Sequence, residues 1–97
     1  MKTEFEIEIG ETFQIELASS PSTGYSWKWV NKDDVTAVDT VGHHFIESGP
    51  GKIGGGGIEI WNFKGIKSGS AVIKLEYNRY WESGPAANVE IIEVKVK

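Results

Sequence analysis

The stretch that decides the fold runs from residue 71 to residue 77 and reads Ala71-Val72-Ile73-Lys74-Leu75-Glu76-Tyr77. Apolar side chains occupy every second position, beginning at Ala71 and ending at Tyr77. Successive side chains of a β-strand point to opposite faces, so this period predicts a strand with one buried face. A helix would instead repeat its apolar residues every three to four positions.

The same period recurs in both directions from this stretch, and polar or glycine-rich turn signals separate the repeats. The further segments are 4–9, 13–17, 25–29, 58–66 and 89–96, with a less regular one at 35–46. The chain has 11 Ile and 8 Val but only 2 Leu, and β-branched residues favour strands over helices. The parity of the apolar residues changes between Ile91 and Ile92, which predicts a β-bulge there.

We therefore predict an all-β fold, a single domain over residues 1–97 with seven to eight short antiparallel strands. Strands with one apolar face are best buried by packing two sheets, so an immunoglobulin-like β-sandwich is expected. In such a sandwich alternate connections collect at one end. The connections 19–24, 48–57 and 79–87 stand in positions that would bring them together.

Composition and charge exclude several classes of function. The net charge is −4 and there is no Cys, which disfavours nucleic-acid binding and removes thiolate metal sites and cysteine nucleophiles. No apolar stretch approaches the ~20 residues that a membrane helix needs. The first residues, Met1 to Glu6, contain no apolar signal segment; a cytoplasmic location is expected if the chain is complete.

A search for catalytic or cofactor chemistry finds no convincing site. The two His residues are adjacent, His43 and His44; neighbours on a strand face opposite ways, so we expect a surface pair and no shared metal. Residues 49–54 match the letters of a G-x-G-x-x-G motif but are followed by more glycine and a strand pattern, not by a helix. We expect a protein that is not an enzyme and needs no cofactor.

Three loop segments carry the strongest functional signal. The first is Ser20-Pro21-Ser22-Thr23-Gly24-Tyr25, in which Pro fixes φ and the hydroxyls bond local backbone, predicting a stiff loop. The second is Gly54-Gly55-Gly56-Gly57, whose use would be close approach of backbone to another molecule. The third is Arg79-Tyr80-Trp81, built from the residue types enriched at binding hot spots.

In this order and spacing, the three segments resemble the motifs of the chagasin-like inhibitors of papain-family cysteine peptidases. That family carries an N-P-T-T-G-[YF] loop, a Gly-rich loop and an R-P-[WF] loop. Three positions depart from the pattern: Ser20 stands for Asn, Ser22 for Thr and Tyr80 for Pro. The resemblance extends over nearly the whole chain, because the strand rhythm between the motifs also fits.

The resemblance implies a monomeric inhibitor of papain-like, cathepsin L-type cysteine peptidases. It implies that three adjacent loops fill the peptidase cleft reversibly, with Thr23 and Gly24 nearest the enzyme's catalytic Cys and with Arg79 and Trp81 on the opposite side. The implied peptidase-binding residues are Ser20, Pro21, Ser22, Thr23, Gly24, Tyr25, Gly54, Gly55, Gly56, Gly57, Arg79, Tyr80 and Trp81.

The main alternative is a carbohydrate-binding module. The chain has 4 Trp and 3 Tyr, and exposed aromatic rings on a β-sandwich would form a platform for sugars. Trp27 and Trp29 share parity and would line one face together, although aromatic side chains are also the largest core residues. A purely structural immunoglobulin-like module is a second alternative, but it gives no purpose to the glycine run or to Arg79-Tyr80-Trp81.

Overall fold

A computed structural model describes residues 2–20, 24–47, 56–79 and 84–97, which form seven strands and one short 3₁₀ helix. The strands are β1 (Lys2–Ile7), β2 (Thr12–Ser19), β3 (Tyr25–Trp29), β4 (Val38–Glu47), β5 (Gly57–Gly65), β6 (Gly69–Arg79) and β7 (Asn88–Val96). The 3₁₀ helix, Lys32–Asp34, lies between β3 and β4. In these ranges no helix has the length and apolar character needed to span a membrane.

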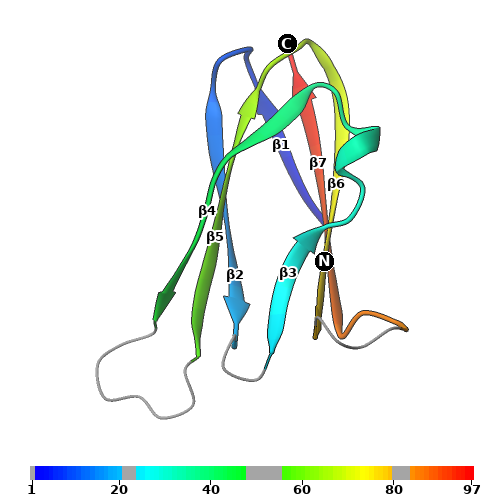
Figure 1. Ribbon diagram of the computed structural model, residues 1–97. Helices are drawn as coiled ribbons and strands as arrows, with labels where there is room; N and C mark the ends of the chain where they lie inside the picture. Colours follow the sequence, from blue (N-terminus) through cyan, green and yellow to red (C-terminus); the bar gives the residue numbers. More distant parts are fainter. Residues whose placement is uncertain (1, 21–23, 48–55, 80–83) are drawn as a thin grey trace.

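The strands form two sheets that face one another (Figure 1). One sheet has the order β1-β7-β6-β3 and the other the order β2-β5-β4, which confirms the predicted immunoglobulin-like β-sandwich. Among the described strands every neighbouring pair is antiparallel except β1 and β7, which run parallel. The apolar period fixes which face of β1 is buried but not its direction, because no turn connects β1 to its partner.

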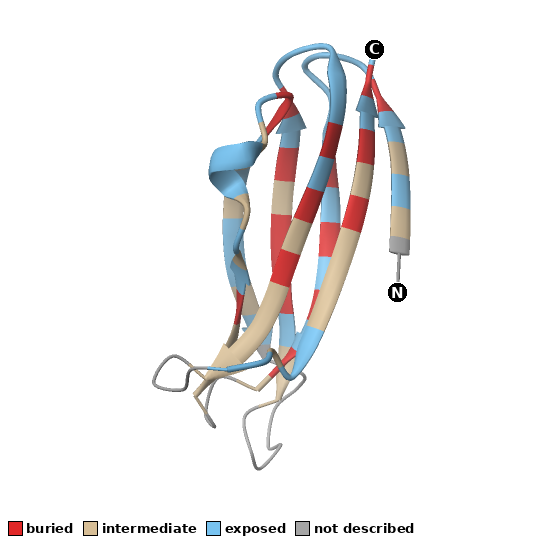
Figure 2. Ribbon diagram, turned by 90° about the vertical axis from the view of Figure 1, so that its right-hand side faces the viewer, coloured by how far each residue is buried: buried red, intermediate tan, exposed pale blue. Residues whose placement is uncertain are grey.

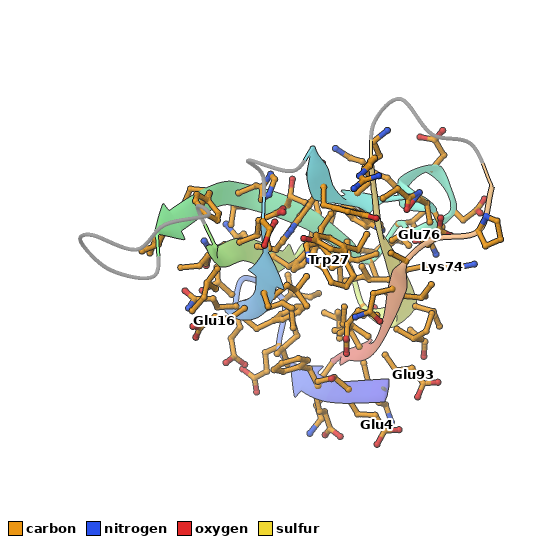
Figure 3. The ribbon with its side chains drawn as sticks, turned by 90° about the horizontal axis from the view of Figure 1, so that it is seen from below. Glu4, Glu16, Trp27, Lys74, Glu76 and Glu93 are labelled. Carbon is orange, nitrogen blue, oxygen red and sulfur yellow. The ribbon has the colours of Figure 1, made fainter. Side chains whose placement is uncertain are left out.

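The core lies between the sheets, and buried positions alternate with exposed ones along the central strands (Figure 2). Phe63, Ile73, Leu75 and Ile92 are all 0% exposed, so the residues predicted from the period-2 pattern do form the centre of the fold. Seen from one end of the sandwich, Trp27 lies among the side chains between the sheets, whereas Glu4, Glu16 and Glu93 lie at the periphery (Figure 3).

The predicted bulge at Ile91 and Ile92 is wrong. The pairing of β7 with β6 continues through both residues without a shift, with Ile91 opposite Lys74 and Ile92 opposite Ile73. Ile92 faces the core, and Ile91 is half-buried on the outer face of a strand that has a neighbour on each side. The register shift lies instead in β4, between Thr40 and Gly42.

Candidate functional site

The strand ends that flank the three predicted loops meet at one end of the sandwich (Figure 1). In the small sheet, Gly57 at the start of β5 pairs with Ser19 on one side and with Glu47 on the other. In the large sheet, Tyr25 at the start of β3 pairs with Arg79 at the end of β6. We call this end the rim, made of Ser19, Ser20, Gly24, Tyr25, Gly56, Gly57 and Arg79.

A stack of aromatic rings runs from the core to the rim. The ring centroids of Trp27 and Tyr77 are 5.0 Å apart, as are those of Tyr77 and Tyr25. The guanidinium carbon of Arg79 lies 4.7 Å from the centroid of the Tyr25 ring, a cation–π contact. The Tyr77 hydroxyl accepts a 2.8 Å hydrogen bond from the backbone N–H of Ser20. The bases of the first and third loops are therefore joined through the side chains of the large sheet.

The glycines at the start of β5 have different surroundings. A Cβ on Gly57 would lie 2.2 Å from the carbonyl oxygen of Ile46 and 2.7 Å from a ring carbon of Phe45, so no side chain fits there. Among the described residues, a Cβ on Gly56 would meet only the Ser20 hydroxyl, at an ordinary 3.9 Å. Gly57 is thus required by the hairpin itself, whereas no contact with the described residues requires glycine at position 56.

One rim-proximal residue that the sequence did not single out is Glu59 in β5. It is only 3% exposed, and its carboxylate accepts a 2.5 Å hydrogen bond from the Ser19 hydroxyl. Its other oxygen lies 2.7 Å from Nε2 of His43. The sequence does contain one sign of this burial. Glu59 lies on the same face of its strand as the apolar residues Trp61 and Phe63, because the three occupy alternate positions.

The expected surface position of His43 and His44 is confirmed: both residues are exposed on the edge strand β4, and the His43 side chain is 42% exposed. In addition to its bond with Glu59, the His43 ring stacks on Trp61 with a centroid distance of 4.0 Å. Its position opposite Trp61 in the register places it on the inner face of β4. The described ranges contain no cluster of three or more residues suited to a metal ion.

The structure does not support the alternative of a sugar-binding aromatic platform. Trp27 is 5% exposed and Trp61 is 7% exposed, and both belong to the core. Trp29 is half-buried against the core, where it packs edge-on against Phe63 at a centroid distance of 5.3 Å. The shared parity of Trp27 and Trp29 thus reflects core packing.

The structure describes about half of the predicted peptidase-binding set. Six of these residues lie at the rim and are half-buried: Ser20, Gly24, Tyr25, Gly56, Gly57 and Arg79. Gly24 adopts a φ of 86°, the left-handed conformation that favours glycine. The other seven lie outside the described residues: Pro21, Ser22, Thr23, Gly54, Gly55, Tyr80 and Trp81.

Comparison with known proteins agrees with this architecture. Residues 6–96 match the model of the chagasin family of peptidase inhibitors, I42. Amoebiasin-2 of Entamoeba histolytica is 33% identical over 81 residues, which cover 80% of this chain and 63% of that protein. Chagasin of Trypanosoma cruzi is 27% identical over 94 residues, 94% of this chain and 84% of chagasin.

A solved structure shares the whole fold. The crystal structure of the cysteine protease inhibitor EhICP2 from Entamoeba histolytica superimposes with a TM-score of 0.81 and 25% identity, covering 98% of this chain and 87% of that one. The family model spans nearly the full sequence, from the end of β1 to the end of β7. This chain therefore belongs to the chagasin family of peptidase inhibitors, a family of inhibitors and not of enzymes.

Proposed function

We propose that this protein inhibits papain-family cysteine peptidases by filling the active-site cleft with the loops that leave the rim. The observation that carries the proposal is the convergence of the loop stems: Ser19 with Gly57, and Tyr25 with Arg79, at one end of the sandwich. Three loops that start from one edge of a rigid body are suited to fill a cleft together, and this is a chain of the chagasin family.

Contacts within the free protein already fix the positions of the loop stems. The Arg79 guanidinium rests on Tyr25, and the Tyr77 hydroxyl holds the Ser20 backbone. Ordering loops on binding costs free energy, about 0.5–1.5 kcal/mol for each immobilised side chain. Fixing the stems in the free protein reduces this cost, which supports tight binding without any covalent step.

We assign the contact surface to residues 20–25, 54–57 and 79–81, as the family motifs imply. The first loop would approach the catalytic Cys of the peptidase, the glycine run would lie along the cleft through its backbone groups, and Trp81 would anchor the third loop. Cleavage is not expected, because no peptide bond of the inhibitor need be held in a near-attack geometry at the nucleophile.

The test is a titration of papain whose active sites have been counted. We expect a stoichiometric loss of activity that excess substrate reverses, with the inhibitor intact on a gel afterwards. Trypsin, a serine peptidase, is the control and should keep its full activity. No inhibition of papain or of a cathepsin L-type enzyme at micromolar inhibitor would refute the proposal.

A further inference from the structure

The buried carboxylate of Glu59 lies directly beneath the rim. Glu59 and Ser19 are the two buried polar residues of the described chain, each 3% exposed. Burying a charged group is costly unless hydrogen bonds replace the water it loses. The fold therefore needs partners for Glu59 at this depth.

The two carboxylate oxygens connect three other strands to β5. One oxygen, Oε2, accepts hydrogen bonds from the Ser19 hydroxyl at 2.5 Å and from the Trp27 backbone N–H at 3.1 Å. The other oxygen, Oε1, lies 2.7 Å from Nε2 of His43. Ser19 ends β2, Trp27 lies in β3 and His43 lies in β4. A single side chain thus joins the small sheet to β3 of the large sheet.

These partners are located at the stems of two of the loops. Ser19 and Trp27 stand on either side of the first loop, and His43 and Glu59 belong to the hairpin that carries the glycine run. The first loop also crosses from one sheet to the other. Backbone pairing within a sheet cannot fix the spacing of its two stems. Hydrogen bonds between the sheets do so: those from Ser19 and Trp27 to one Glu59 oxygen, that from Trp27 Nε1 to the Ala18 carbonyl, and that from the Ser20 N–H to the Tyr77 hydroxyl.

We infer that Glu59 is a positioning residue for the inhibitory surface: it sets the separation of the first-loop stems and their height relative to the glycine run. The inference rests on the proposed function. A well-packed leucine in place of a buried ionic group often stabilises a protein as much or more. Directional hydrogen bonds to three strands fix the positions of those strands relative to one another, which an apolar side chain cannot do.

The experiment compares Glu59→Leu, Glu59→Gln and a matched control by their inhibition constants against papain. Leucine removes all three bonds, and we expect the inhibition constant to rise about tenfold or more. Glutamine keeps one oxygen for Ser19 and Trp27, and its amide faces a His43 ring that offers either tautomer. Glu59→Gln should therefore stay within about threefold of the wild type.

The matched control separates positioning from general stability. Val96→Ala removes a core side chain, 3% exposed, at the end of β7, where it pairs with Gly69 at the end of β6 away from the rim. It should lower the melting temperature while leaving the inhibition constant unchanged. A second readout is independent of peptidase: deuterium exchange of the Trp27 amide should accelerate in Glu59→Leu but not in Glu59→Gln.

The outcomes are distinguishable. A folded Glu59→Leu that inhibits as well as the wild type would overturn the positioning role and leave the proposed function standing. If the wild-type protein does not inhibit at all, the positioning role and the proposed function are both refuted. If Glu59→Leu does not fold, Ser19→Ala replaces it, because it removes one bond and no charge; we expect about a threefold rise in the inhibition constant, and no rise would overturn the inference.

Discussion

The two ends of the sandwich are closed by different means. At the end opposite the rim, short turns are tied by backbone hydrogen bonds, from Gly10 N–H to the Gly65 carbonyl and from Lys97 N–H to the Ile7 carbonyl, both 2.8 Å. At the rim, side chains bring the strand ends together: the carboxylate of Glu59 and the hydroxyl of Tyr77.

The two ends therefore differ in how freely their residues can be substituted. A Cβ on Gly65 would lie 2.9 Å from a methyl carbon of Ile7 and 3.1 Å from one of Val96, so a side chain fits at position 65 only if these neighbours move. At the rim the side chains of Glu59 and Tyr77 fix the stems of the loops. Binding residues are expected on such loops, supported by a rigid scaffold.

The largest expected effect comes from breaking the core that both ends share. Phe63 is 0% exposed and contacts Phe13 and Trp29, with centroid distances of 5.4 and 5.3 Å. Phe63→Ala should lower the free energy of unfolding by about 3–5 kcal/mol, which is much of the stability of a small domain. Urea denaturation measures it, and an unchanged midpoint would contradict the described core.

The second prediction concerns binding alone. Trp81 lies outside the described residues, and its role rests on the third motif. Trp81→Ala should weaken papain binding by about 2 kcal/mol or more with no change in the urea midpoint, as expected for a residue that contacts the peptidase and not the core. A lower midpoint with unchanged inhibition would instead assign Trp81 to the core. Trp81→Phe, which keeps an aromatic ring, is the intermediate control.

Two adjacent glycines sharpen the contrast between scaffold and loop. Gly57→Ala forces a Cβ against the Ile46 carbonyl and should cost about 1–3 kcal/mol of folding stability. Gly56→Ala meets only ordinary contact and should change stability by less than about 0.5 kcal/mol. If the glycine run contacts the peptidase through its backbone, Gly56→Ala still raises the inhibition constant. Thermal melts and inhibition assays on both variants separate these effects; equal loss of stability in both would contradict the geometry.

The smallest effect is expected from an exposed ion pair at the closed end. The Lys97 ammonium lowers the pKa of Glu6, chiefly by a hydrogen bond and then by its charge, and Glu6 raises the pKa of Lys97. A lowered carboxyl pKa adds stability above its unfolded value, which is lost as pH falls through the folded value. The raised Lys97 pKa adds stability below its own unfolded value, which is lost at alkaline pH as it deprotonates.

Salt provides the control for this pair. Glu6→Gln should lower the melting temperature slightly at neutral pH in dilute buffer and not at all in 1 M salt, because exposed pairs are screened. Glu4→Gln, whose carboxylate has no ion pair with any side chain that the structure describes, should show no such salt dependence. A salt-independent loss in Glu6→Gln would mean that packing, and not charge, is responsible.

The sequence predicted the sandwich because the period-2 pattern of Ala71 to Tyr77 and its repeats reports which face of each strand is buried. The sequence did not predict how the strands pair with one another. The parallel partner of β1 and the uninterrupted register at Ile91 depend on neighbours far along the chain. An isoleucine half-buried on an outer face is indistinguishable, in a single sequence, from one displaced by a bulge.

The site was predicted in the same uneven way. The loop motifs stand out by composition, and their stems do meet at one end. Glu59 was missed because an acidic residue in a strand is most often exposed, and its burial depends on partners that come from three other strands. His43 was correctly placed at the surface, but its bond to Glu59 and its stacking on Trp61 were not predicted.

The most direct test of the account is amide hydrogen exchange of this protein with and without bound papain. We predict that protection on binding appears in residues 20–25, 54–57 and 79–81, while the closed-end turns at 8–11 and 66–68 exchange as in the free protein. Protection concentrated at the closed end, or on the outer face of either sheet with none at the rim, would contradict the claim that the rim loops form the inhibitory surface.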